Sequence, residues 1–360
     1  TGTPQRRVKL NDPELKTLVF RGVHARNLQI DEITVPLQRF TVVTGVSGSG
    51  KSTFCREVLF ENLSRRLKDA QAPLVGTDQL TGFENVGRVL EVDQTPIGKN
   101  SRSCPATYVG IMTAIRDLYA ATNEAQARGY DASRFSFNKA VGACPVCAGQ
   151  GLRTVEMNFL PDVKVLCEAC AGKRFNPETL EVLWRGKSIG DVLEMEIDEA
   201  VDFFASMPSI AYPLKLMQDV GLGYLTLGQP SPTLSGGEAQ RLKLVTELAK
   251  VRTDGSFAAR APHTLYVLDE PTVGLHMTDV DRLSKVLSRL VDAGSTVVVI
   301  EHNLDIAADA DWIIDLGPEG GAKGGKVVAQ GSPKMVARKN TATGIVLRAF
   351  LAEHKPVKST

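Results

Sequence analysis

Residues 45–52 constrain what this chain can fold into more than any other part of its 360-residue sequence. They read Gly-Val-Ser-Gly-Ser-Gly-Lys-Ser and match the pattern G-x-x-x-x-G-K-[ST]. The apolar run Phe40 to Thr44 before the motif predicts a strand, and we expect a helix to open after it. In that context the glycines let successive backbone N–H groups cradle phosphate oxygens. The pattern predicts an α/β nucleotide-binding core; the alternative is a glycine-rich turn with an incidental lysine.

This phosphate loop supplies most of the expected nucleotide ligands. Lys51 is expected to reach the β- and γ-phosphates of ATP, and is counted among the catalytic residues. The hydroxyl of Ser52 is expected to bind Mg²⁺. The loop residues expected at the nucleotide are Gly45, Ser47, Gly48, Gly50, Lys51, Ser52 and Thr53.

A second apolar run, Leu265 to Leu268, predicts a buried strand that ends in two carboxylates, Asp269 and Glu270. Asp269 is expected to hold Mg²⁺, and Glu270 to polarise the attacking water. The alternative is a surface turn that happens to be acidic. Beside a phosphate loop, the catalytic interpretation is favoured.

Two further polar residues are expected near the γ-phosphate and the metal. His302 follows the predicted strand Thr296 to Ile300, where it could touch the γ-phosphate and sense its loss. Gln94 ends the first core segment and could ligate Mg²⁺. Taken alone, a histidine is usually structural and a loop glutamine is usually surface, so both assignments depend on the other motifs.

The stretch Leu234 to Arg241 reads L-S-G-G-E-A-Q-R and predicts a second anion site. Ser235 can cap the following helix, and Glu238 three residues later completes a capping box. Gly236 and Gly237 expose backbone N–H groups at that helix start. Two phosphate-binding surfaces in one chain allow a γ-phosphate to be held between two modules facing head to tail. Together with the phosphate loop, this string indicates the ABC class of ATPases.

Two Cys-x-x-Cys pairs, Cys144 with Cys147 and Cys167 with Cys170, are typical of a structural zinc site with four thiolates. Gly149 and Gly172 follow the pairs and free the backbone for tight turns. The alternatives are two disulfides or a redox pair. The remaining cysteines, Cys55 and Cys104, are interpreted as ordinary residues.

The region around these cysteines has six basic side chains against three acidic ones, with aromatic residues between them. This is compatible with contact to a nucleic-acid backbone, and equally with a solvated face over a small aromatic core. The residues are Arg134, Lys139, Arg153, Lys164, Lys173 and Arg174, then Glu156, Asp162 and Glu168, with Phe135, Phe137, Phe159 and Phe175.

Composition excludes some classes of protein. Lys plus Arg number 42 and Asp plus Glu 41, so the net charge of +1 does not indicate a globally basic nucleic-acid binder. Because no run of 18 apolar residues occurs, we expect no membrane span. With no apolar signal segment, we expect a cytoplasmic location, where reduced thiols bind metal.

The order of these motifs predicts a nucleotide-binding core interrupted by an insertion. The expected parts are a first core segment (1–98), an inserted, mainly helical signature subdomain (99–232) with a zinc module at about 134–176, the signature helix with the second core segment (233–340), and a C-terminal helix and tail (341–360). Helical segments are expected at Thr107 to Ala121 and Ile197 to Met207, with a helix capped by Thr278. Closing strands are expected at Trp312 to Leu316 and Lys326 to Ala329.

Together the motifs resemble the C-terminal ATPase half of the UvrA family, the A subunit of the bacterial excinuclease. The resemblance runs from about Val19 to Gly331. The matching stretches, besides the two cysteine pairs, are Thr44 to Thr53, Val92 to Gly98, Pro105 to Tyr108, Arg134 to Asn138, Gly172 to Asn176, Thr233 to Leu244, Leu268 to His276, Val298 to Leu304 and Trp312 to Gly321.

The resemblance implies a DNA-binding ATPase, not itself a nuclease, that recognises damage in nucleotide excision repair. It implies ATP, Mg²⁺ and Zn²⁺ as cofactors, with Zn²⁺ on Cys144, Cys147, Cys167 and Cys170. It also implies damaged double-stranded DNA, another ATPase half and an excinuclease B-type subunit as partners, and a nucleoid-associated location. The basic residues around the cysteines are the DNA contacts expected by this analogy.

Three departures from the family pattern leave alternatives open. The stretch Arg252 to Pro262 is longer than usual, Val273 replaces Thr or Ser, and Cys104 stands where Asn is common. These features fit a divergent paralogue linked to drug resistance or damage tolerance. A transporter ATPase subunit is the other alternative, against which the four-cysteine insertion argues.

Overall fold

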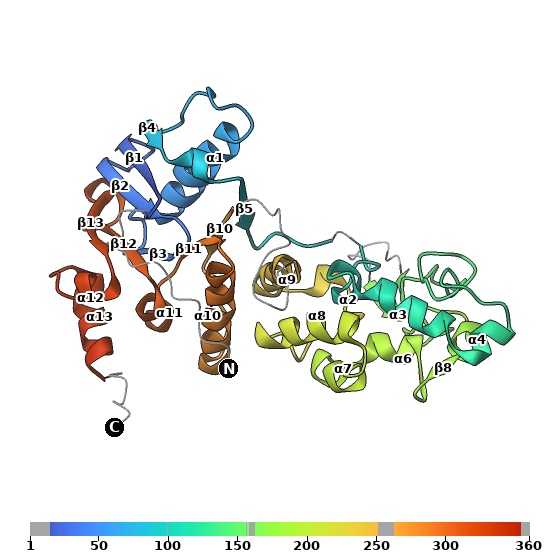
Figure 1. Cartoon of the computed structure of the whole chain (residues 1–360). Coiled ribbons are helices and arrows are strands. Elements are labelled where there is room, and N and C mark those ends of the chain that lie inside the picture. The colour runs from blue at the N-terminus through green and yellow to red at the C-terminus, as the bar shows by residue number, and fades with distance from the viewer. Residues whose placement is uncertain (1–14, 99, 156, 158–162, 251–262, 354–360) are drawn as a thin grey trace. The chain divides into compact units, whose positions relative to one another are not determined.

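The computed structural model describes residues 15–98, 100–155, 157, 163–250 and 263–353. It divides into two compact units (Figure 1): Thr1–Asp93 with Lys250–Thr360, and Gln94–Ala249. We call these the core unit and the inserted unit. The stretch 252–262, and Glu156, Phe159 and Asp162, lie outside the described residues.

A six-stranded sheet forms the centre of the core unit, in the order β13-β12-β3-β11-β10-β5. Five of its strands run parallel, and β13 pairs antiparallel with β12. The strands are β3 (Phe40–Gly45), β5 (Arg88–Val92), β10 (Thr264–Asp269), β11 (Thr296–Ile300), β12 (Trp312–Gly317) and β13 (Lys326–Gly331). Every residue of β3 and β11 is buried, as expected for parallel strands covered on both faces. The expected core strands are confirmed.

An antiparallel sheet and several helices complete the core unit. The sheet has the order β2-β1-β4, with β1 (Thr17–Val23), β2 (Ile30–Pro36) and β4 (Thr77–Thr81). The phosphate loop leads into η1 (Thr53–Phe60), a π-helical segment that continues as α1 (Glu61–Arg66). Phe54 of η1 packs edge-on against Phe20 of β1, with ring centroids 5.8 Å apart. The remaining elements are η2 (Phe83–Asn85), α10 (Met277–Asp292), α11 (Leu304–Asp309), η4 (Gly321–Lys323), α12 (Pro333–Val336) and α13 (Ala342–Glu353).

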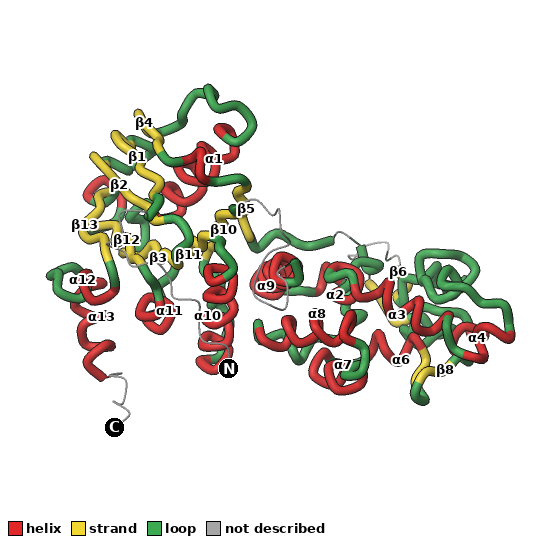
Figure 2. Tube along the Cα trace, in the orientation of Figure 1, coloured by secondary structure: helices red, strands yellow, loops and turns green. Residues whose placement is uncertain are grey.

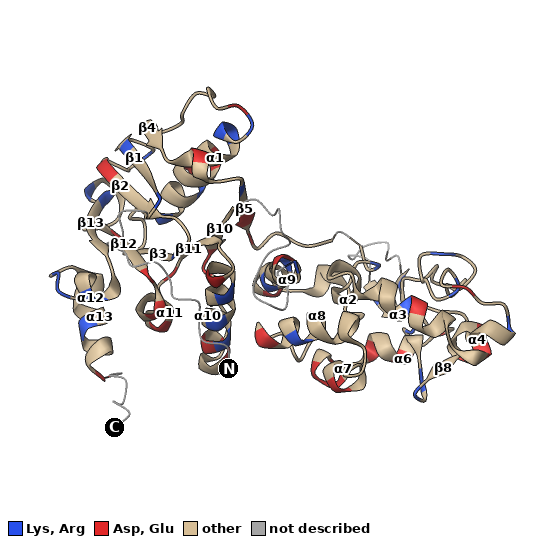
Figure 3. Ribbon diagram, viewed as in Figure 1, with Lys and Arg blue, Asp and Glu red and all other residues tan. Residues whose placement is uncertain are grey.

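Helix α10 is amphipathic. Val280, Leu283 and Leu287 on one side are buried. The helix also carries acidic and basic side chains (Figure 3), and Lys285 forms an ion pair of 2.6 Å with Asp281. The expected cap is wrong: His276 is the N-cap, because its imidazole accepts from the backbone N–H of Thr278 at 3.5 Å.

The inserted unit is mainly helical (Figure 2), which confirms the expected fold class. Its helices are α2 (Pro105–Tyr108), α3 (Ile111–Ala120), α4 (Asn123–Ala127), α5 (Pro177–Leu180), α6 (Ile189–Glu194), α7 (Ile197–Phe203), α8 (Pro208–Asp219), η3 (Ser231–Thr233) and α9 (Gly236–Leu248). Its strands form two small hairpins, β6 (Leu152–Val155) with β7 (Val163–Leu166) and β8 (Leu183–Trp184) with β9 (Lys187–Ser188).

Three expectations differ from the structure here. The helical segment expected from Thr107 is split into α2 and α3, because Gly110 takes a left-handed φ of 89° between them. The helix that begins at Ile197 ends at Phe203. Helix α9 belongs to the inserted unit, although the sequence grouped it with the second core segment. No described helix is long and apolar enough to cross a membrane.

Candidate functional site

The phosphate loop takes a conformation that requires glycine at its first position. Gly45 ends β3 with φ of 135°, and Gly48 and Gly50 also have left-handed φ values of 74° and 100°. A Cβ on Gly45 would lie 1.9 Å from the carbonyl oxygen of Leu316 on β12. The loop is therefore packed directly against the sheet, which holds it in shape.

Lys51 is folded back onto the loop. Its Nζ donates to the carbonyls of Gly45 at 3.0 Å and Val46 at 2.9 Å. Burial lowers the pKa of Lys51, while the nearby carboxylates of Glu270 and Asp269 act in the opposite direction. The side chains of Ser47 and Ser52 are exposed. The loop thus exposes two hydroxyls, while the Lys51 amine is held against the loop's own carbonyls.

A brace that sequence reasoning missed supports the outer side of the loop. The amide of Asn27 donates to the carbonyls of Gly48 and Gly321, both at 3.1 Å. The backbone N–H of Gly321 donates to the Gly48 carbonyl at 3.0 Å. The glycine-rich turn after β12 thereby fixes the outer edge of the phosphate loop. The glycines of this turn are the sequence signal that could have indicated its contact with the phosphate loop.

The two predicted carboxylates and His302 come together because β10 and β11 are adjacent and parallel. Oε1 of Glu270 lies 3.6 Å from Nε2 of His302. Glu270 has a left-handed φ of 44°, a strained value for this residue type. Strain of this kind is found where a side chain must be aimed at one position.

Asp269 is held by a residue that the sequence analysis did not single out. Nη2 of Arg56 lies 3.1 Å from Oδ2 of Asp269, and its Nε lies 2.7 Å from Oε1 of Glu91. Arg56 therefore joins the helix after the phosphate loop to the ends of β10 and β5. One carboxylate oxygen of Asp269 is oriented by this pair.

Buried Glu301 organises the backbone beside these groups. Its Oε2 accepts from the backbone N–H of His302 at 2.8 Å and of Asn303 at 3.1 Å. Its Oε1 accepts from Thr272, at 2.9 Å from the backbone N–H and 2.5 Å from the hydroxyl. One carboxylate thus ties the segment that carries His302 to the segment after Glu270. A carboxylate at the end of an apolar strand is the signal that could have revealed it.

In the inserted unit, the signature helix begins as predicted. Ser235 is the N-cap of α9; its Oγ accepts from the Glu238 N–H at 3.3 Å, and its own N–H donates to Glu238 Oε2 at 2.7 Å. Gln94 lies against this helix start, since a Cβ on Gly236 would be 3.2 Å from Gln94 Oε1. Lys243 donates to the carbonyl and hydroxyl of Thr95, both at 2.8 Å. The segment after β5 is thereby fastened to α9.

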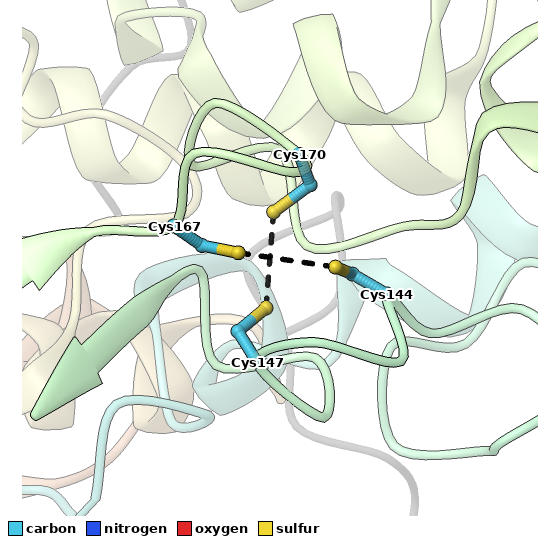
Figure 4. Close-up of side chains that lie close together, drawn as sticks. All are labelled: Cys144, Cys147, Cys167 and Cys170. Atoms are coloured by element: carbon cyan, nitrogen blue, oxygen red, sulfur yellow. Dashed lines mark hydrogen bonds between the residues drawn. The ribbon is translucent and has the colours of Figure 1, made fainter.

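The four cysteines converge on one point (Figure 4), with their sulfur atoms all within 4.8 Å of one another. Cys144 Sγ lies 3.9 Å from Cys167 Sγ, and Cys147 Sγ lies 3.7 Å from Cys170 Sγ. A tetrahedral ion with Zn–S bonds of about 2.3 Å needs sulfur atoms about 3.8 Å apart. A disulfide needs about 2.05 Å, and all six cysteines are free. The geometry therefore fits a metal site and contradicts the disulfide alternative.

The backbone around the cysteines is shaped for this purpose. The expected turn glycines, Gly149 and Gly172, have left-handed φ values of 76° and 86°. Burial raises the pKa of Cys170 to about 12 and also raises that of Cys147. Burial acts the same way on Cys167, but N–H groups and neighbouring thiols outweigh it and lower its pKa. Four thiolates at this spacing would repel one another without a cation between them, so metal binding and loss of the thiol protons would be coupled.

No family model matches the chain. Comparison with curated proteins gives 56% identity over 337 residues to UvrABC system protein A from Thermus thermophilus. The same protein is 50% identical in Aquifex aeolicus over 349 residues and in Bacillus subtilis over 353 residues. These matches cover 94%, 97% and 98% of this chain.

The chain belongs to the UvrA family. It spans only 34% to 36% of the length of these relatives. The crystal structure of UvrA2 from Deinococcus radiodurans matches with a TM-score of 0.82 and 46% identity, over 95% of this chain and 40% of that chain. Membership of the UvrA family disfavours the transporter alternative.

Within this UvrA-family chain, three of the six basic residues expected to contact DNA have partners inside the inserted unit. Arg174 is buried and donates to the carbonyls of Ser101 at 2.7 Å and Gly228 at 2.6 Å. Lys173 Nζ lies 2.6 Å from Asp191. The side chain of Arg134 bonds Thr179 and Asn176 and lies 4.4 Å from the centre of the Tyr130 ring.

The other three basic residues, Lys139, Arg153 and Lys164, are exposed. Of the aromatic residues, Phe135, Phe137 and Phe175 are buried, so the small aromatic core is confirmed. Cys55 and Cys104 are also buried, as expected for ordinary residues. Val273, one of the departures from the family pattern, is 55% exposed in the segment after Glu270.

Proposed function

We propose that this chain is a Mg²⁺-dependent ATPase module of a UvrA-type DNA-repair protein. ATP held between two such modules would control their association and their affinity for DNA. The observation that supports this best is the meeting of Asp269, Glu270 and His302 at the carboxyl ends of β10 and β11, in the unit that also carries the phosphate loop. Carboxyl ends of parallel strands are where α/β folds bind ligands.

In the proposed reaction, the loop N–H groups and Lys51 hold the β- and γ-phosphates. Ser52, Asp269 and Gln94 are the proposed Mg²⁺ ligands, and the ion would neutralise phosphate charge. Glu270 accepts a proton from the water that attacks the γ-phosphorus, and the bond to the β-phosphate oxygen breaks. ADP and phosphate are the products, and His302 contacts the γ-phosphate until it leaves.

The second phosphate-binding surface comprises Ser235, Gly236 and Gly237 of the signature helix. We propose that it closes on a nucleotide held by the phosphate loop of a partner module, in a head-to-tail dimer. The partner is another ATPase half, from the same or a second subunit. An excinuclease B-type subunit is a further proposed partner, by family resemblance.

The four cysteines are proposed to bind Zn²⁺ structurally, since four thiolates leave no open position for a substrate. The hairpin of β6 and β7 projects from this cluster and carries the exposed Arg153 and Lys164. These residues, with Lys139, are the proposed contacts to the backbone of damaged double-stranded DNA. DNA affinity should fall steeply with salt, and R153A/K164A should reduce the slope of log K against log salt by about 2.

The assignment of Glu270 is tested by Glu270→Gln, which keeps the size of the side chain but removes the base. The variant is expected to bind ATP as the parent does and to lose turnover by a factor of about 100 or more. Glu32→Gln, at an exposed position of β2, is the control and should hydrolyse ATP at the parental rate. Parental turnover in Glu270→Gln would contradict the assignment.

A further inference from the structure

Tyr224 occupies an unusual place beside the signature helix. It lies in the loop between α8 and η3, and its residue is 57% exposed. Its hydroxyl nevertheless donates to Oε1 of Glu238 at 2.6 Å, a short hydrogen bond to a charged acceptor. The exposed ring therefore ends in a fixed polar contact.

Glu238 is shared between this tyrosine and the helix cap. While Oε1 accepts from Tyr224, Oε2 accepts from the backbone N–H of Ser235 at 2.7 Å. The Ser235 hydroxyl oxygen also accepts from the Glu238 N–H at 3.3 Å. Tyr224, Glu238 and Ser235 thus form one chain of hydrogen bonds that ends at the proposed phosphate-binding hydroxyl.

The environment of Tyr224 and Glu238 fixes which of the two donates the hydrogen bond. Burial and then the Glu238 carboxylate raise the pKa of Tyr224 to about 12, so the phenol keeps its proton. Burial tends to raise the pKa of Glu238, but hydrogen bonds from Tyr224 and Ser235, with the charge of Arg241, lower it. Tyr224 is therefore a donor and Glu238 an acceptor at neutral pH.

The loop that carries Tyr224 is a firm support. Its neighbours Gly223 and Leu225 accept from the backbone N–H groups of Asp198 at 3.0 Å and Ile197 at 2.9 Å, at the start of α7. A Cβ on Gly223 would lie 2.1 Å from the Asp198 carboxylate, so the loop packs closely against that helix. Leu225 is buried. The tyrosine hydroxyl therefore gives the Glu238 carboxylate a second fixed contact, beside the one to the Ser235 N–H.

We propose that Tyr224 is a positioning residue for the signature motif, holding the Glu238 carboxylate on the helix cap and away from the anion site. This inference rests on the proposed function, in which Ser235 and the following glycines receive a partner's γ-phosphate. Without the tyrosine hydroxyl, the carboxylate can turn toward that site and repel the phosphate. Tyr224 would then affect closure of the ATP sandwich and leave ATP binding to the phosphate loop unchanged.

The test compares Tyr224→Phe, Glu238→Ala and the double variant with the parent chain. We expect Tyr224→Phe to lower kcat by about tenfold, the effect of losing one charge-assisted hydrogen bond. ATP-dependent self-association should weaken by a similar factor, while the Kd for a fluorescent ATP analogue stays within about twofold of the parental value. In the Glu238→Ala background, Tyr224→Phe should have no further effect.

Tyr130→Phe, in the loop after α4, is the matched control and should leave kcat unchanged. An active parent whose kcat is unchanged by Tyr224→Phe would overturn the inference while the proposed function stands. A further loss from Tyr224→Phe in the Glu238→Ala background would also overturn it, because Tyr224 would then act by another route. A parent without Mg²⁺-dependent ATP turnover would contradict the proposed function itself and the inference with it.

Discussion

The phosphate loop and the cysteine cluster are both tight turns built on glycine, but different forces hold them. The phosphate loop lies against a six-stranded sheet, and its shape is set by buried strands and by contact with β12. The cysteine turns carry an exposed two-stranded hairpin, and the thiols themselves form the local cluster. The first site can be complete before its ligand arrives. The second, as a proposed zinc site, is expected to depend on its ligand for its own structure.

Metal removal should have the largest effect, because it should disrupt the cysteine cluster and leave the phosphate loop intact. Stripping the metal with a chelator, or Cys167→Ser, should unfold the region around the cysteines, since a structural Zn²⁺ site contributes on the order of 10 kcal/mol. ATP affinity of the core unit should remain. The measurement is limited proteolysis of the zinc module alongside nucleotide titration. Cys55→Ser is the control for cysteine replacement, and an intact module in chelator would contradict the comparison.

Gly45→Ala tests how closely the sheet holds the phosphate loop. The new Cβ would lie 1.9 Å from the Leu316 carbonyl, so we expect a loss of about 3 kcal/mol of unfolding free energy together with ATP binding. Gly294→Ala is the matched control: it has a φ of 94° with no atom within 4 Å of the added Cβ. That variant should lose only about 1 kcal/mol. Equal losses in denaturant melts would show that close packing is not what shapes the loop.

Arg174→Met tests how much the buried Arg174 contributes to the stability of the inserted unit. The change leaves two backbone carbonyls unsatisfied and should cost about 2 kcal/mol. Arg185→Met is the control, because Arg185 also bonds a carbonyl, that of Phe203 at 2.9 Å, but is exposed. Its loss should be below about 1 kcal/mol. If thermal denaturation shows the order reversed, Arg174 does not hold this unit together.

Much of the core unit could be predicted because its signals are local. The loop motif, the apolar strand Thr296 to Ile300 and the paired carboxylates each follow from residues close together in the chain. The cysteine spacing predicted the metal geometry for the same reason. Parallel pairing of β10 and β11 then placed Glu270 beside His302, as the motif order suggested.

What sequence reasoning missed depends on contacts between distant residues. Asn27 donates to the carbonyl of Gly321, which lies 294 residues further along the chain. No local sequence pattern predicts such a contact. Arg174 appeared as one of several basic residues, yet burial and two carbonyl acceptors make it structural. The sequence predicts Thr278 as the cap of α10, since threonine is a common N-cap residue, whereas the structure has His276 there. Charge and residue type alone do not distinguish a surface contact from a buried one.

Equilibrium titration of the parent chain with a fluorescent ATP analogue, with and without Mg²⁺, tests directly whether this chain binds ATP through Mg²⁺. We predict saturable binding that weakens about tenfold or more when Mg²⁺ is chelated, and binding that is lost in Lys51→Ala. Equal affinity with and without Mg²⁺, or unchanged binding in Lys51→Ala, would contradict the assignment of this chain as a Mg²⁺-dependent ATPase module.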